Sequence, residues 1–325
     1  LTARTTAGFS LLGVSWDDPD AVPPGGVQVR TRAAGRGAWS AWRALPTDSE
    51  DQPEQAERTA PGTRAATAPL WVGPSDGVEV RAGGSGPLPA GLRVDLVDPG
   101  AAPRAAAPAA EPPAPRLAPG VDHQAPRPGI VTRSGWGADE SLRESGFVYT
   151  GDVREVFVHH TDTGNDYSCS DAPAIIRGIY QYHVQTNGWR DIGYNFLVDR
   201  CGQIYEGRAG GVARSVLGAH TLGFNTDSSG VAAIGTFDDA QPPQAQVEGV
   251  AKIAAWKLGL TGRDAGGSVT LTSASSGSRY PQGTSHTFSA ISGHRDAFNT
   301  DCPGDTLANR LGDIRALASH LQGRQ

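Results

Sequence analysis

Two different patterns of apolar and polar positions divide this chain. Up to about residue 98, short runs alternate between apolar and polar residues and are separated by clusters of Gly, Pro and Asp. Such runs are typical of the strands of an all-β sandwich. The clearest runs cover residues 9–16, 27–32, 78–81 and 92–97. We therefore expect residues 1–98 to form an all-β, sandwich-like accessory domain.

From about residue 128, segments in which apolar residues recur every second position are mixed with segments in which they recur every three to four positions. Alternation over residues 153–159 and an apolar run over 230–236 predict strands. Apolar residues at three- and four-residue intervals over 244–258 and 306–320 predict helices, and Ser170 or Asp171 is placed to cap another. Residues 128–325 are therefore predicted to be an α/β domain with a mixed central β-sheet flanked by helices.

Three stretches have the composition of connecting segments. Residues 99–127 are rich in Ala and Pro, which cannot bury a core, and are expected to form a semi-rigid linker that holds the two domains apart. Residues 47–68 read as a long loop inside the first domain. The Gly/Ser/Thr-rich stretch at about 264–290 contains two β-prone pieces and reads as an inserted hairpin of unassigned function.

Composition and charge exclude some classes of partner. The formal net charge of -6 gives no electrostatic reason to expect a nucleic acid. No run of 18 apolar residues is present, so no membrane span is predicted. Nothing in the sequence indicates the oligomeric state. Four tryptophans of the first domain fit either its core or a sugar-stacking surface: Trp16, Trp39, Trp42 and Trp71.

The candidate chemistry lies in two separated stretches. His294 and Cys302 are eight positions apart in a loop of small and polar residues, and His159 and His160 stand at the end of a predicted strand. Two imidazoles and one thiolate can hold zinc and leave its fourth position open, as in catalytic sites. Neighbours on a strand face opposite sides, so only one of His159 and His160 can join His294. The alternative is that these histidines are hydrogen-bonded polar residues at a sheet end.

The three cysteines form an odd set. If Cys302 is a metal thiolate, Cys169 and Cys201 remain as a pair that can close a disulfide loop, which implies an oxidising, extracellular setting. The alternative is three buried thiols.

Seven short sequence motifs then occur in a characteristic order. They are WGA at 136–138, FVHHT at 157–161, DIGYNFL at 191–197, IYEGR at 204–208, GAHT at 218–221, AIG at 233–235 and GHRDAFNTDCPG at 293–304. This order resembles the peptidoglycan recognition protein (PGRP) family, whose enzymatic members are similar to phage-type N-acetylmuramoyl-L-alanine amidases. The resemblance covers about residues 128–321 and leaves residues 1–127 outside it.

The resemblance implies a zinc site and a catalytic partner. Carried over by position, it makes His159, His294 and Cys302 the ligands of Zn²⁺ and Tyr194 a catalytic residue. Thr300 stands where such amidases have a residue that lines the site. A tyrosine hydroxyl can donate to the oxyanion that develops on a scissile amide, so these groups suit amide hydrolysis.

The resemblance also implies two residues that contact substrate. His220 is expected on the floor of the substrate groove, and Arg208 can pair with a carboxylate of the stem peptide. Two departures from related enzymes stand out. Residues 230–235 hold no carboxylate, which leaves the proton acceptor unidentified, and Ala209 and Gly210 follow Arg208 where diaminopimelate-preferring members often have Gly-Trp.

The sequence therefore predicts a zinc hydrolase that cuts the amide between N-acetylmuramic acid and L-alanine of peptidoglycan. The alternative is a binding protein of the same fold that recognises peptidoglycan without cutting it. Non-enzymatic relatives typically lose the cysteine ligand, and Cys302 is present. Either protein is expected to be secreted and associated with the cell wall.

Overall fold

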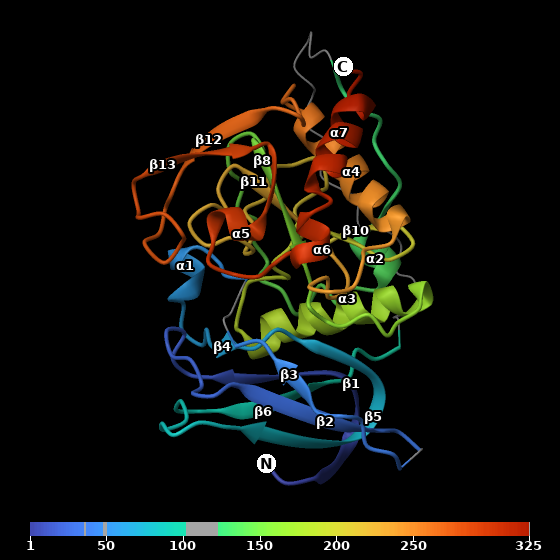
Figure 1. The fold of residues 1–325 in the computed structure, drawn as a ribbon, viewed down its shortest axis with the longest axis vertical. Helices are drawn as coiled ribbons and strands as arrows, with labels where there is room; N and C mark the ends of the chain where they lie inside the picture. Colours follow the sequence, from blue (N-terminus) through green and yellow to red (C-terminus); the bar gives the residue numbers. More distant parts are fainter. Residues whose placement is uncertain (36, 48–50, 102–122, 325) are drawn as a thin grey trace.

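A computed structural model of the protein describes residues 1–35, 37–47, 51–101 and 123–324 (Figure 1). It contains an N-terminal β-sheet, at the bottom of Figure 1, and an α/β domain above it. Most of the expected linker at 99–127 lies outside the described residues. In the part of the chain that the structure covers, no helix combines the length and the apolar character needed to cross a bilayer.

The N-terminal domain is built on β-strands, as the alternating runs predict, and it also contains the four-residue helix α1 (Gln55–Arg58). Its six strands pair antiparallel in one curled sheet, in the order β3-β2-β5-β1-β4, and β6 also pairs with β1. The strands are β1 (Arg4–Trp16), β2 (Val27–Ala33), β3 (Arg43–Leu45), β4 (Ala65–Ala66), β5 (Leu70–Ala82) and β6 (Arg93–Val97). Apolar side chains from β1, β2 and β5, among them Leu12, Val29 and Val80, form the core.

The four tryptophans of this domain divide into two pairs. Trp16 and Trp71 are buried, so they belong to the core. Trp39 and Trp42 are half-buried, and the guanidinium of Arg30 lies 5.3 Å and 5.0 Å from the centres of their rings. The core interpretation therefore holds for Trp16 and Trp71.

The C-terminal domain has the expected mixed sheet flanked by helices. The strand order is β14-β8-β11-β9-β10-β7, parallel except for the β9–β10 pair. The strands are β7 (Ile130–Val131), β8 (Glu155–His160), β9 (Phe196–Val198), β10 (Ile204–Glu206), β11 (Ser228–Ala233) and β14 (Ile291–Gly293). The helices are α2 (Arg133–Trp136), η1 (Cys169–Asp171), α3 (Ala172–Gln181), η2 (Tyr182–Thr186), α4 (Gln244–Gly259), α5 (His294–Ala297), α6 (Asp305–Ala308) and α7 (Leu311–Leu321).

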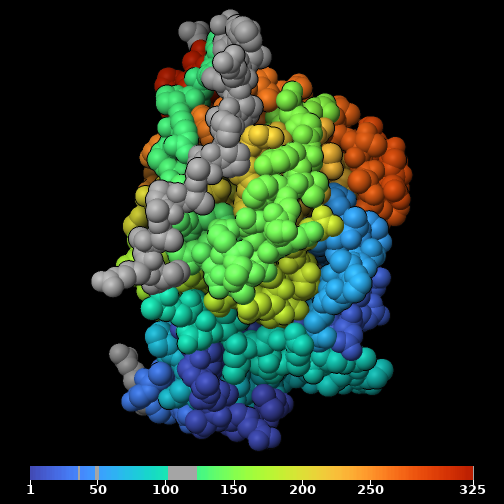
Figure 2. All heavy atoms as spheres, turned by 180° about the vertical axis from the view of Figure 1, so that it is seen from behind, coloured from blue at the N-terminus to red at the C-terminus, as the bar shows by residue number. Residues whose placement is uncertain are grey.

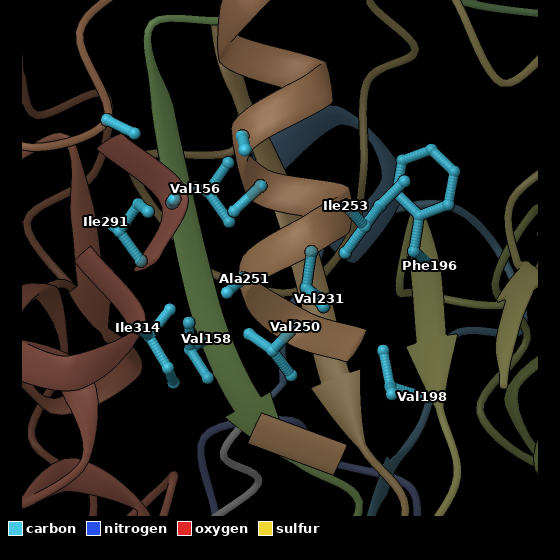
Figure 3. Close-up of a cluster of buried hydrophobic side chains, with 14 of the residues drawn as sticks. Val156, Val158, Phe196, Val198, Val231, Val250, Ala251, Ile253, Ile291 and Ile314 are labelled. Carbon is cyan, nitrogen blue, oxygen red and sulfur yellow. The ribbon is translucent and has the colours of Figure 1, made fainter. Parts of the chain in front are cut away.

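The two faces of this sheet are covered by different helices. Val158 of β8 and Val231 of β11 point towards α4, where they meet Val250 and Ile253 (Figure 3). Residues of α7 join the same cluster. Ala232, the neighbour of Val231, packs in the opposite cluster with residues of α3. Strand alternation therefore buries both faces and leaves the ends of the strands to carry the site.

Two further features surround the sheet. Strands β12 (Ser268–Thr272) and β13 (Ser285–Ser289) pair antiparallel as a two-stranded hairpin that packs Phe288 against Phe157 of β8. A disulfide joins Cys169, at the start of η1, to Cys201 in the turn between β9 and β10. Cys302 is a buried free thiol.

The two domains pack directly against each other (Figure 2). Leu11 and Trp71 of the N-terminal sheet share an apolar cluster with Ile175 of α3 and with Tyr182. The Tyr182 hydroxyl donates to the carbonyl of Thr67 at 3.2 Å. The prediction that the linker holds the domains apart is therefore wrong, because composition does not reveal the apolar surface between the domains.

Candidate metal centre

Two side chains from the ends of neighbouring strands meet a third from a loop in the C-terminal domain. His159 ends β8 and His294 directly follows β14, the parallel neighbour of β8. Cys302 lies in the loop between α5 and α6. One donor atom of each of these three buried residues lies within 4.8 Å of the others, and Cys302 Sγ is 3.7 Å from His159 Nδ1. The structure thus brings together the three residues that the sequence offers as metal ligands.

The state of His294 fits a metal ligand. Its side chain is fully buried, and neither ring nitrogen has a hydrogen-bond partner among the described residues. Burial, together with the charge of His159, holds the pKa of His294 well below its ordinary value. A neutral imidazole keeps a lone pair available for a cation. Two imidazoles and a thiolate are a donor set that suits Zn²⁺.

Thr221 orients the ring of His159. Its hydroxyl lies 3.4 Å from His159 Nε2 and 3.0 Å from His220 Nδ1. A ligating imidazole usually engages its second nitrogen in this way, which turns the first nitrogen towards the metal. Sequence reasoning missed Thr221 as a site residue although it belongs to the GAHT motif. Such a motif indicates the protein family, but it does not show which hydroxyl contacts which ring.

Backbone hydrogen bonds hold Cys302 in place. The N–H of His160 donates to Cys302 Sγ at 3.4 Å. The hydroxyl of Thr300 accepts from the N–H of Cys302 at 3.0 Å, so Thr300 shapes the cysteine loop. The carbonyl of Cys302 accepts from the N–H of Arg295 at 2.9 Å, which ties the loop to α5.

The neighbouring polar residues have structural roles. The Asp296 carboxylate accepts from the N–H of Gly293 at 2.9 Å. His160 turns away from the cluster, and its Nδ1 accepts from the N–H of Phe237 at 3.4 Å. As expected from alternation along β8, His159 faces His294 and His160 does not.

His220 lies behind the site and not on an exposed groove floor. Its ring is fully buried and packs on those of Phe157 and His159, with a centroid distance of 5.1 Å to His159. Burial lowers the pKa of His220 well below its ordinary value. A Cβ at Gly218 or Gly230 would come within 2.4 Å of the ring, so these glycines make room for it. His220 therefore packs beside His159 in the described structure, and its expected contact with substrate stays a prediction.

Tyr194 stands beside the cluster together with a residue from the other domain. Its ring centre is 5.7 Å from that of His159. Its hydroxyl donates to Asp51 Oδ2, and Asp51 Oδ1 lies 3.3 Å from His159 Nδ1. Sequence reasoning missed Asp51, because it belongs to the N-terminal domain and no motif surrounds it.

Arg208 is also engaged by the N-terminal domain. Its two terminal nitrogens donate to Glu57 Oε2 at 3.1 Å and Oε1 at 2.9 Å, and its Nε donates to the carbonyl of Ile192 at 2.9 Å. Both side chains of this pair are buried. Arg208 does bind a carboxylate bidentately, but in this structure the carboxylate comes from the chain itself.

Comparison with known proteins gives matches to both domains. Residues 149–305 match the family described as N-acetylmuramoyl-L-alanine amidase. Residues 1–116 match the family described as Rv3811 N-terminal galactose-binding domain-like.

Individual relatives match the C-terminal part. The human N-acetylmuramoyl-L-alanine amidase is 36% identical over 159 residues, which are 48% of this chain and 23% of the human protein. Peptidoglycan-recognition protein SC2 of Drosophila melanogaster is 29% identical over 184 residues, which are 56% of this chain and 84% of that protein. Among solved structures, wild-type Drosophila PGRP-LB is 27% identical, with a TM-score of 0.45 over 57% of this chain and 92% of that chain.

Motif order and sequence matches together define the class of protein. The C-terminal domain belongs to the family of peptidoglycan recognition proteins and amidase-2-type N-acetylmuramoyl-L-alanine amidases. The matched relatives include proteins named as amidases and proteins named as recognition proteins.

Proposed function

We propose that this protein hydrolyses the amide bond between N-acetylmuramic acid and L-alanine of peptidoglycan in a zinc-dependent reaction. The observation that carries the proposal is the buried set of His159, His294 and Cys302 with Tyr194 beside it. A bound zinc ion would supply Lewis-acid polarisation of the scissile carbonyl. Family membership supplies the substrate class.

The protein side chains have distinct tasks in this reaction. His159, His294 and Cys302 hold the cation, and Thr221 keeps Nδ1 of His159 turned towards it. The Tyr194 hydroxyl donates a hydrogen bond to the oxyanion that develops on the carbonyl. Arg208 pairs with a carboxylate of the stem peptide through the two nitrogens that Glu57 now occupies. Thr300 preserves the backbone geometry of the cysteine loop.

The site of action is peptidoglycan outside the cytoplasm. The disulfide between Cys169 and Cys201 supports this proposal, because such bonds persist in oxidising compartments. The proposed location is therefore secreted and associated with the cell wall.

Analysis of digested cell walls tests the activity. The zinc-loaded chain is incubated with purified peptidoglycan, and mass spectrometry measures free stem peptides that begin with L-alanine. A Cys302→Ser variant is the matched control, because it replaces one ligand atom and nearly preserves the volume of the side chain. We expect release by the wild-type chain and loss of release in the variant.

The second candidate is peptidoglycan recognition without cleavage. It is favoured by the relative named peptidoglycan-recognition protein SC2. It predicts that zinc-loaded protein binds peptidoglycan but that sugar and L-alanine stay joined in every digest, including digests by the Asp51 variants described below.

A further inference from the structure

Residues 51–58 of the N-terminal domain extend into the C-terminal domain. This segment, which we call the 51–58 segment, contains the short helix α1 (Gln55–Arg58). In Figure 1, α1 lies away from the N-terminal sheet and close to α5. The segment carries a carboxylate at every third position, at Asp51, Glu54 and Glu57. Each of the three contacts a different part of the C-terminal domain.

Asp51 stands at the open side of the metal centre. Asp51 Oδ1 is 3.3 Å from His159 Nδ1, and Cys302 Sγ is 3.7 Å from the same nitrogen. In a tetrahedral zinc site, two ligand atoms are separated by about 3.4 Å for a nitrogen and an oxygen and by about 3.6 Å for a nitrogen and a sulfur, from the usual metal–ligand lengths. The separation from Cys302 fits a shared metal ion, whereas Asp51 borders His159 and does not belong to the group whose donor atoms all lie within 4.8 Å of one another.

Tyr194 holds the second oxygen of the same carboxylate. Its hydroxyl donates to Asp51 Oδ2. This hydroxyl is also the group that we assign to the carbonyl oxygen of the substrate. Asp51 therefore engages the donor that the scissile amide would need, in addition to standing beside His159.

The other two carboxylates extend the contact away from the metal centre. Glu57 takes both terminal nitrogens of Arg208 and also accepts from the N–H of Arg190 at 2.9 Å. Glu54 Oε1 accepts from the N–H of Asn225 at 3.0 Å, and the carbonyl of Gln52 accepts from the side chain of Asn225 at 3.1 Å. The segment is thus held at three points by polar groups of the C-terminal domain.

Empty space borders the segment on several sides. One pocket is lined by Asp51, Gln52 and His183 of η2. A second is lined by Gln52 together with residues of the loop between β12 and β13. A third is lined by Glu57 and Arg208. The segment therefore borders three hollows, one of which contains Arg208.

We propose that the 51–58 segment is an intramolecular occupant of the substrate groove, in which Asp51 holds the Tyr194 hydroxyl beside the metal centre. In this arrangement Glu57 takes the place of a stem-peptide carboxylate on Arg208. The identity of the displaced substrate rests on the proposed function. Asp51 engages the Tyr194 hydroxyl and Glu57 engages Arg208, so the segment must leave before a peptidoglycan amide can use these groups.

An occupant of this kind lowers the apparent affinity for substrate. When the groove is free in only a fraction of molecules, the apparent dissociation constant of the substrate rises by the inverse of that fraction. Asp51 as a general base makes the opposite prediction, because loss of a base slows hydrolysis. The sign of the change in activity on removing Asp51 therefore separates the two roles.

The first experiment measures metal binding by the full chain. Visible spectra of the Co²⁺-loaded protein and competition of zinc with a chromophoric chelator are compared for wild type and Asp51→Ala. The matched control is Asp76→Ala, which removes an exposed carboxylate of the same domain. We expect both variants to keep the cobalt spectrum and the zinc affinity of wild type, because His159, His294 and Cys302 supply the donors. An altered spectrum with weaker zinc binding only in Asp51→Ala would show that Asp51 is a metal ligand and would overturn its role as part of the occupant.

The second experiment measures substrate binding and turnover. Calorimetric titration of the zinc-loaded full chain with N-acetylmuramoyl pentapeptide compares wild type with Asp51→Ala/Glu57→Ala. We expect at least tenfold tighter binding and faster release of stem peptides in the double variant. The milder pair Asp51→Asn/Glu57→Gln, which preserves side-chain shape, should change in the same direction if the alanine variant folds poorly. Unchanged or weaker binding, or slower turnover, would overturn the occupant.

The experiments distinguish failure of the proposed hydrolase activity from failure of the proposed occupant. If no variant releases stem peptides but the pentapeptide affinity responds as expected, the occupant stands and the hydrolase is wrong. If wild type and variants release peptides equally fast and bind the pentapeptide equally, the hydrolase stands and the occupant is wrong.

Discussion

Glu57 of the N-terminal domain and Arg208 of the C-terminal domain form a buried ion pair with two parallel hydrogen bonds. The side chains are 5% and 6% exposed, so each charge depends on the other for compensation. This pair joins the interface between the domains to the proposed recognition of substrate. Any change to it should therefore affect both the stability of the protein and the accessibility of the groove.

Replacing Glu57 should destabilise the folded protein. Glu57→Gln keeps the shape of the side chain but leaves the guanidinium of Arg208 without its counter-charge. Breaking a buried pair in this way costs about 3 kcal/mol of unfolding free energy. Denaturant titration of the full chain measures it. Glu79→Gln, which breaks the more exposed pair with Arg30, should cost less than about 1 kcal/mol, and equal losses in both variants would contradict the argument.

Removing the hydroxyl of Thr221 should weaken metal binding without removing a ligand. Thr221→Val deletes the group that lies between His159 Nε2 and His220 Nδ1. Loss of such a support typically lowers metal affinity about 10- to 100-fold. Zinc affinity is measured by competition with a chelator, and Thr270→Val on the exposed face of β12 is the control. Zinc affinity equal to that of the control would show that Thr221 does not orient His159.

The set of metal ligands could be predicted from the sequence because each of its residues lies within a continuous sequence motif. His159 lies within one such motif, and His294 and Cys302 share another. Alternation along β8 also selected His159 over His160. The burial of His220 could not be predicted from a motif, because it depends on the space left by Gly218 and Gly230.

The contribution of the N-terminal domain to the site could not be predicted from the sequence, for a different reason. Residues 47–68 have the composition of a loop, and composition does not show where a loop lies. The three-residue spacing of Asp51, Glu54 and Glu57 is visible in the sequence, but acidic residues at that spacing usually face solvent. Only the packing of α3 against the N-terminal sheet brings the 51–58 segment to the metal centre.

His183 should make the stability of the protein depend on pH. Burial, with a smaller contribution from the charge of Arg208, lowers the pKa of His183 from 6.5 to about 3. Between these values the unfolded chain binds a proton that the folded chain does not, so stability falls as the pH decreases from 6.5 towards 3. One such group contributes a slope of about 1.4 kcal/mol per pH unit.

Comparison with a variant isolates this contribution. His183 Nδ1 accepts from the N–H of Gly193 at 3.1 Å, and the side-chain carbonyl of His183→Gln can accept the same hydrogen bond. Unfolding free energies of metal-free wild type and variant are measured from pH 7 to pH 4.5. The difference between them should change with pH below 6.5, and a constant difference would show that His183 is protonated in the folded state.

The adjacent histidines of β8 provide the sharpest test of the metal centre. His159 Nδ1 faces Cys302 and His294, whereas His160 Nδ1 accepts from the N–H of Phe237. His159→Asn should therefore abolish stoichiometric zinc binding, because it removes one of the three donors of the cluster. His160→Asn should retain zinc, since its side chain faces the other way. Metal content of the two purified variants, determined by atomic absorption, decides the matter, and loss of zinc from His160→Asn alone would exclude the site as described.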